Sequence, residues 1–118
     1  MITVLFVAAT PWEQRIITQS IKTLHYPGIH PLFLTTGIGS YAMIGSLVAY
    51  LSQHAEIDFV VNIGICGYHP EYALNAPLIQ VGHIRSGSNQ KEEIPLLPFR
   101  FAPLGSFYSS EREVRSLE

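Results

Sequence analysis

The sequence predicts an α/β fold, with a mostly parallel sheet and flanking helices arranged in three layers. Three observations predict it. Apolar runs occur at residues 2–9, 31–36 and 57–63. They are too continuous for strands with one solvent-exposed face, in which apolar and polar residues alternate. The segments between these runs place apolar residues at helical spacing. The resulting order of strand, helix, strand, helix, strand is typical of parallel α/β sheets.

The first strand and helix have clear signals. Residues 2–9 form a continuous apolar run with β-branched members, which predicts a strand buried on both faces. Thr10 and Pro11 then open a helix that ends near residues 26–28, where Pro and Gly follow each other. The residues of this helix expected to follow one helical face are Ile16, Ile17, Ser20, Ile21 and Leu24.

A second strand is predicted at residues 31–36, followed by a tight glycine turn at residues 37–40 and a helix over residues 41–54. The apolar residues of this helix expected to share one face are Ile44, Leu47, Val48 and Leu51. We expect Gly45 to permit close packing of this helix on the sheet, although it costs ~1 kcal/mol relative to Ala.

The later part of the chain is less regular. A third strand at residues 57–63 ends at Gly64, and a loop follows to residue 73. Residues 78–84 predict another strand, the polar residues 85–93 predict a surface loop, and residues 99–109 predict one more strand.

Composition excludes several classes of protein. The 118 residues suffice for one domain, and a hydrophobic content of 47% excludes disorder. The net charge of −2, without a basic stripe, argues against nucleic-acid binding. No apolar run reaches membrane-spanning length, and the start lacks the basic region of a signal peptide. A single cysteine permits no internal disulfide and fits a cytoplasmic location.

A charged fraction of only 14% is low for a small free-standing domain. Large apolar surfaces rarely stay in contact with water, so part of this surface is expected to be covered by another segment or a partner subunit. An ordinary apolar-rich domain explains the same figure.

Unusual residues gather where the predicted strands end, at residues 9–13, 37–40 and 62–67. In open α/β sheets ligands bind at the carboxyl ends of the strands, so these segments are the candidate site. In the first of them, Thr10 followed by Glu13 matches a capping box, and the spacing alone favours that role. A carboxylate at a strand's carboxyl end can also act as a general base on water.

The second segment, residues 37–42, matches the G-x-G-x-x-A pattern of dinucleotide-binding folds. That function also needs an acidic residue at the end of the next strand, and Asp58 lies near the beginning of that strand instead. The turn could still hold an anion or ribose oxygens with its backbone N–H groups. A tight turn without any ligand is the alternative.

In the third segment two glycines flank a strand end, so either a ligand approaches closely or the chain simply turns. Cys66 is expected to be a small buried hydrophobic residue rather than a nucleophile. The five histidines show no metal-ligand spacing, so no metal site is expected.

Four segments carry a family resemblance: 7–13 (VAATPWE), 35–39 (TTGIG), 60–67 (VVNIGICG) and 80–84 (QVGHI). In this order they resemble the nucleoside phosphorylase superfamily, and most closely its hydrolytic branch of methylthioadenosine/adenosylhomocysteine nucleosidases and futalosine hydrolases. Cys66 stands where this family usually has Ala, and His83 replaces an Asp.

The resemblance implies cleavage of the N-ribosidic bond of a purine-type nucleoside, through a transition state like an oxocarbenium ion. Glu13 would be the catalytic residue that activates water. The residues implied to line the substrate pocket are Ala9, Gly37, Ile38, Gly39, Ile65, Cys66 and Gly67. The resemblance implies no metal or organic cofactor, no nucleic-acid or membrane partner, and a homo-oligomer, expected to be a dimer.

The family also uses a Met-Glu pair that grips the ribose and a late Asp that protonates the base, and residues 1–118 contain neither at a matching place. We therefore expect these residues to be the amino-terminal part of a single phosphorylase-like domain, inactive or nearly so alone. The alternatives are a non-catalytic module that binds a nucleoside or a partner, and a nucleoside phosphorylase.

Overall fold

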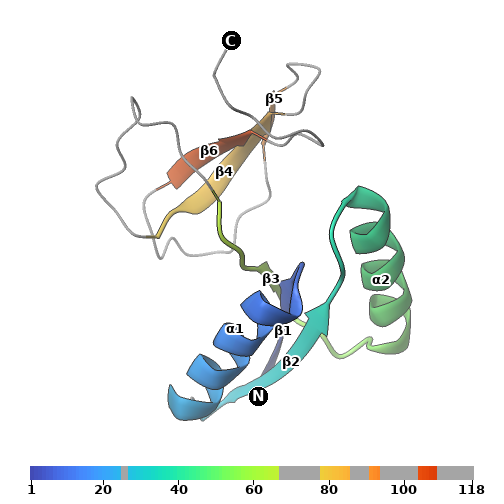
Figure 1. The fold of residues 1–118 in the computed structure, drawn as a ribbon. Helices are drawn as coiled ribbons and strands as arrows, with labels where there is room; N and C mark the ends of the chain where they lie inside the picture. The colour runs from blue at the N-terminus through green and yellow to red at the C-terminus, as the bar shows by residue number, and fades with distance from the viewer. Residues whose placement is uncertain (25–26, 67–77, 86–90, 94–103, 109–118) are drawn as a thin grey trace. The chain divides into compact units, whose positions relative to one another are not determined.

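The computed structural model describes residues 1–24, 27–66, 78–85, 91–93 and 104–108 (Figure 1). The chain divides into two compact units, Met1–Cys66 and Gly67–Glu118. Each unit is described by itself, as the amino-terminal unit and the carboxyl-terminal unit. None of the helices in the described ranges is both long enough and apolar enough to cross a membrane.

The amino-terminal unit alternates strands and helices. Its elements are β1 (Ile2–Ala8), α1 (Pro11–Leu24), β2 (Ile29–Thr35), α2 (Ser40–Gln53) and β3 (Phe59–Asn62). The strands form one sheet in the order β2-β1-β3, and both pairings are parallel. The predicted α/β class with a parallel sheet is therefore confirmed for this unit.

β1 is the central strand of this sheet and supplies most of its core. Val4, Leu5, Val7 and Ala8 are all buried, Leu5 and Ala8 completely. Consecutive side chains of a strand point to opposite faces of the sheet, so the consecutive buried residues of β1 show that both of its faces are shielded from water, which fits its continuous apolar sequence. Pro31 on the outer strand β2 aligns with Val4.

The strand register sets the position of the loops. Ala8 aligns with Thr35 of β2, and Val7 aligns with Asn62 of β3. All three strands therefore end at one edge of the sheet, called here the carboxyl edge. After β1 the chain forms β2 on one side of β1, and after β2 it crosses over to form β3 on the other side of β1. The carboxyl edge between β1 and β3 is thus a topological switch point, where ligands of open α/β sheets bind.

The buried side of α1 matches the predicted apolar face only in part. Ile17 is buried as expected, but the other buried residue is Gln14, and Ile16 is 47% and Leu24 57% exposed. The reason is the Gln14 side chain, whose Nε2 donates hydrogen bonds to the carbonyl oxygens of Phe6 (3.2 Å) and Leu34 (2.6 Å). These bonds turn the side that begins at Gln14 toward the sheet.

The residues of α2 that were predicted to share one face are not covered by the sheet. No residue of α2 is buried, and Ile44 and Val48 are 59% and 62% exposed. A Cβ on Gly45 would meet no atom within 4 Å, so this glycine does not mediate close packing on the sheet. A hydrogen bond from Ser46 Oγ to the carbonyl oxygen of Thr36 (3.1 Å), the residue after β2, joins α2 to the turn that precedes it.

The carboxyl-terminal unit contains β4 (Gln80–Arg85), β5 (Lys91–Glu93) and β6 (Leu104–Tyr108), in the order β5-β4-β6. β4 pairs with β5 antiparallel and with β6 parallel. The strands predicted at residues 78–84 and 99–109 correspond to β4 and β6. The surface loop predicted at residues 85–93 was wrong for Lys91–Glu93, which pair with β4. The described strands thus form two sheets rather than the single one expected.

Candidate functional site

Glu13 lies in the first turn of α1, at the carboxyl edge of the sheet. The Thr10 hydroxyl donates a hydrogen bond to Oε1 of Glu13 (2.8 Å), and the Glu13 N–H donates to Oγ1 of Thr10 (3.3 Å). The bond from the Glu13 N–H is the N-cap bond of the predicted capping box, whereas the Glu13 carboxylate accepts from the Thr10 hydroxyl rather than from the Thr10 backbone N–H. The bond from the Thr10 hydroxyl fixes one carboxylate oxygen against the loop that leaves β1.

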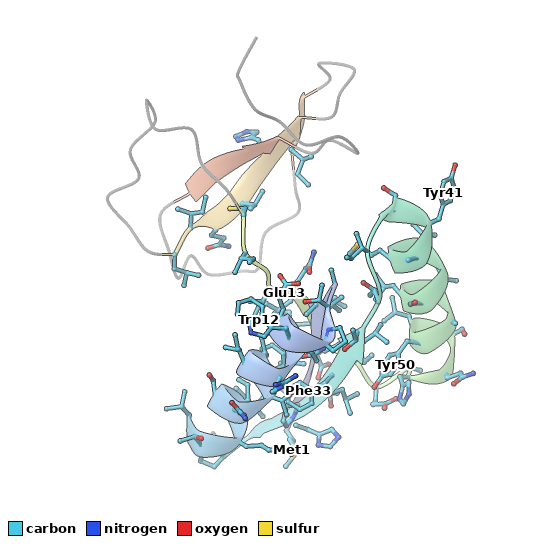
Figure 2. All side chains as sticks on the ribbon, viewed as in Figure 1. Met1, Trp12, Glu13, Phe33, Tyr41 and Tyr50 are labelled. Atoms are coloured by element: carbon cyan, nitrogen blue, oxygen red, sulfur yellow. The ribbon has the colours of Figure 1, made fainter. Side chains whose placement is uncertain are left out.

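The second carboxylate oxygen makes a contact far along the chain. The backbone N–H of Ile65 donates a hydrogen bond to Oε2 of Glu13 (3.0 Å). The cap and this long-range bond exist together, because they use different oxygens. The structure therefore joins the first and third candidate segments at the switch point, and Glu13, labelled in Figure 2, is of intermediate exposure.

Gly64 makes this contact possible. A Cβ on Gly64 would lie 2.9 Å from Oε2 of Glu13, closer than real Cβ contacts allow. The strand end itself is held in place, because the Ile63 N–H donates to the carbonyl oxygen of Val7 (2.9 Å). The close approach of the Glu13 carboxylate therefore explains why a glycine, which has no Cβ, follows β3.

The second candidate segment is a tight turn at the end of β2. The Thr36 N–H donates to the carbonyl oxygen of Ala8 (3.0 Å), which extends the ladder between β1 and β2 by one bond. Gly37 and Gly39 then adopt positive φ angles of 88° and 98°, a backbone conformation that favours glycine. Gly39 is the N-cap of α2 and provides no side-chain cap. In the described residues no hydrogen bond joins this turn to Glu13.

Apolar side chains near these loops are open to solvent. Ile38 is 80% exposed, Ile65 74% and Trp12 53%, while Ala9 is of intermediate burial. Cys66 was expected to be buried and is exposed instead. This follows from its place beyond the last ladder bond of β3. Gly67, the remaining predicted pocket residue, lies outside the described residues.

Sequence reasoning missed Gln14, which follows Glu13 directly. Its side chain is 8% exposed, and its Oε1 is buried without a hydrogen-bond partner. The Gln14 amide nitrogen joins the start of α1 to β1 and β2, so it supports the helical turn that carries Glu13. The sequence does contain a signal for a buried Gln14. This residue lies three positions before Ile17 and seven before Ile21, the spacing of residues that share one side of a helix.

Asp58 has a structural role at the opposite edge of the sheet. Its Oδ2 accepts a hydrogen bond from the Thr3 N–H (2.8 Å), and its own N–H donates to the carbonyl oxygen of Thr3 (2.9 Å). This reciprocal pair joins β1 to the start of β3. Asp58 therefore cannot serve as the ribose-binding acid of a dinucleotide site at the carboxyl edge.

A second polar cluster lies beyond the end of α2. His54 Nδ1 is 3.0 Å from Oε1 of Glu56, and the His54 ring stacks on Tyr50 with centroids 4.1 Å apart. A hydrogen bond from its own backbone N–H, followed by the bond to His54, lowers the pKa of the exposed Glu56 carboxyl. The cluster lies away from the carboxyl edge.

The described ranges hold no group of three or more His, Cys, Asp or Glu residues that could bind a metal. A shallow hollow of about 330 Å³ lies on the later turns of α1, lined by Gln19, Ser20, Thr23 and Leu24. It lacks titratable groups and is remote from Glu13, so we assign the site to the carboxyl edge.

Comparison with known proteins adds no assignment. No protein-family model matches the chain, and no curated protein or solved structure matches it significantly.

Proposed function

We propose that the carboxyl edge is the nucleoside-binding end of a hydrolase that cleaves the N-ribosidic bond of a purine-type nucleoside. Glu13 would take a proton from the attacking water. The observation that carries this proposal is the hydrogen bond from the Ile65 N–H to Oε2 of Glu13. It places an oriented carboxylate between two loops at the switch point of the sheet.

The geometry around Glu13 suits a general base. Two donors, the Thr10 hydroxyl and the Ile65 N–H, hold the carboxylate in a fixed orientation. Each carboxylate oxygen has a further lone pair, so a water molecule can still bind. General-base catalysis by a positioned group typically contributes ~10²–10⁴-fold to a rate.

The pocket in this proposal is formed by the three loops of the carboxyl edge. Ala9 and the turn from Gly37 through Ile38 to Gly39 would contact the ribose, where the uncapped N–H groups at the start of α2 can donate to hydroxyl oxygens. Ile65, Cys66 and Gly67 would complete the wall. The three-layer arrangement, with helices on both faces of the sheet, is part of the proposal, because right-handed crossovers favour it for this strand order.

Hydrolysis fits the site better than phosphorolysis. An ionised Glu13 at the point of attack repels phosphate, which carries the same sign of charge. A neutral water molecule meets no such repulsion. The exposed thiol of Cys66 suits a reducing compartment, so we place the protein in the cytoplasm.

We expect residues 1–118 to bind a nucleoside without hydrolysing it. The nucleoside phosphorylase superfamily uses an acid that protonates the base and a Met-Glu pair that grips the ribose, and residues 1–118 contain neither at a matching place. Binding is tested by titrating the ¹⁵N-labelled chain with adenosine or inosine. Amide shifts should concentrate at Gly39, Tyr41 and Ile65. Unchanged amides at millimolar nucleoside would rule out the site, and rapid release of free base would refute the expected inactivity.

A non-catalytic binding module is the second candidate. The same two hydrogen bonds favour it, because both carboxylate oxygens of Glu13 already accept a hydrogen bond. A carboxylate with a purely structural role would make the same contacts. Glu13→Gln separates the two candidates when it is measured in a protein that contains Glu13 together with the base-protonating acid and the ribose-binding pair. A nucleosidase loses ~10²–10⁴-fold in hydrolysis rate while still binding nucleoside. A module binds nucleoside and shows no hydrolysis with either residue.

A further inference from the structure

Gln14 is the only buried polar residue of α1, and its side chain bridges two neighbouring strands. Its Nε2 donates to the carbonyl oxygen of Phe6 on β1 and to that of Leu34 on β2. A primary amide has two N–H donors on one nitrogen, so it can serve both oxygens at once. An apolar side chain of similar size would fill the same space and bond to neither strand.

The helical turn that this amide holds is the one that carries Glu13. The backbone N–H of Gln14 donates to the carbonyl oxygen of Thr10 (3.1 Å), which closes the first turn of α1. Thr10, Glu13 and Gln14 therefore belong to one hydrogen-bonded turn. Ile17, the other buried residue of the helix, lies one turn later. The side chain of Gln14 is thus the polar link between the turn of Glu13 and the sheet.

The two buried residues of α1 constrain the helix in different ways. Apolar burial is non-directional, so Ile17 alone would let the helix shift along the sheet with little change in buried area. Hydrogen bonds weaken steeply as their geometry changes, so the amide of Gln14 fixes the turn at one place. Within the described residues no group donates to Oε1 of Gln14, and a buried acceptor without a donor costs stability. The position of the turn therefore explains a glutamine here better than the stability of the fold does.

The contact between Glu13 and the loop after β3 depends on this position. The Ile65 N–H lies 3.0 Å from Oε2 of Glu13, and a shift of α1 by about 1 Å would take the pair beyond hydrogen-bond distance. A shift in the other direction is blocked, because the carboxylate already lies against Gly64 with no room for a Cβ. Misplacing a reacting group by about 1 Å can cost ~10²-fold in rate.

We propose that Gln14 is a positioning residue for Glu13. Its two hydrogen bonds set the place of the first turn of α1 relative to the loop after β3, and so they orient the carboxylate toward the Ile65 N–H. The catalytic meaning of this inference rests on the proposed function, in which Glu13 takes a proton from water. The positioning itself does not depend on which ligand binds, so it can be tested without one.

The test follows the Ile65 amide of the ¹⁵N-labelled whole chain by NMR as the pH is lowered from neutral to acidic values at which the chain stays folded. An N–H bonded to a carboxylate shifts when that carboxylate takes up a proton, because the charge-assisted bond weakens. Gln14→Met keeps an unbranched side chain of similar length and removes both donors, and it should reduce this shift change by about half or more. Ile17→Val is the matched control, because it trims the other buried residue of α1 and should leave the shift change as in the wild type.

Three results would overturn the proposal: no shift change at Ile65 in the wild-type chain, a full change in Gln14→Met, or an equal reduction in Ile17→Val. If circular dichroism shows that Gln14→Met is unfolded, Gln14→Leu takes its place with the same expected direction. Unfolding of both variants would make Gln14 a folding residue and refute a role confined to position. Nucleoside titration of the wild type is a separate measurement: unchanged amides there would refute nucleoside binding and leave the effect of Gln14 on Ile65 standing.

Discussion

Oε2 of Glu13 and the Cα of Gly64 are packed so closely that a Cβ at position 64 would lie 2.9 Å from the carboxylate oxygen. Both residues border the switch point of the sheet, fifty-one positions apart in the sequence. Their fit allows the Ile65 N–H to reach Glu13. It also makes the site sensitive to a single methyl group.

Gly64→Ala should break the contact between Glu13 and the loop after β3. The Glu13 side chain must move away from the added methyl group, so the Ile65 N–H loses its acceptor and the free energy of unfolding falls by about 1 kcal/mol. Hydrogen exchange of the Ile65 amide and urea denaturation measure the two effects. Gly45→Ala is the control: its Cβ meets open space in a helix interior, and it should stabilise the chain by ~1 kcal/mol.

Thr10→Val should remove the cap of α1 while keeping the shape of the side chain. The Glu13 N–H loses its acceptor and Oε1 of Glu13 loses a donor, so we expect a loss of about 0.5–2 kcal/mol in stability. Thr10→Ser retains the hydroxyl and should lose much less. Equal thermal stability of the two variants would contradict the observed role of the Thr10 hydroxyl.

Asp58→Ala should destabilise the amino edge of the sheet without touching the candidate site. The Thr3 N–H loses the carboxylate that accepts its hydrogen bond, at a cost of about 1–3 kcal/mol. Nucleoside-induced amide shifts at Ile65 should remain. If Asp58→Ala abolished nucleoside binding in a chain that circular dichroism shows to be folded, the assignment of Asp58 as purely structural would be wrong.

The lowered pKa of Glu56 predicts a small pH dependence of stability. A carboxyl whose pKa is lower in the folded state stabilises that state when ionised, so its contribution is present above its usual value of 4.5 and is lost as the pH falls through the folded value. The urea midpoint of the wild-type chain should therefore fall more than that of Glu56→Gln between pH 6 and acidic pH. Parallel curves for the two proteins would contradict this assignment.

The sequence was a good guide where burial is uniform. The continuous apolar run of β1 predicts a strand buried on both faces, and its consecutive side chains are buried as expected. The parallel register then brings all the strand ends to one edge. The capping box at Thr10 and Glu13 was also readable, because it depends on four consecutive residues. These features are set by local chemistry and by one strong hydrophobic pattern.

Features that depend on particular side-chain contacts were not readable. The buried side of α1 is set by the bonds of Gln14 to two carbonyl oxygens, and no hydrophobic pattern reveals a buried amide. The long-range bond between Glu13 and Ile65 needs a loop conformation that the spacing of two glycines does not specify. The close packing of α2 on the sheet that was expected at Gly45 was wrong, because the helix is apolar on more than one side and periodicity alone could not orient it.

Trp12 is the only tryptophan in the chain, and it is 53% exposed in the residue before Glu13. The chain therefore contains a natural fluorophore directly beside the candidate site. Its emission should shift or be quenched when a flat aromatic molecule settles over the first turn of α1, so occupancy can be followed in unlabelled protein at low concentration.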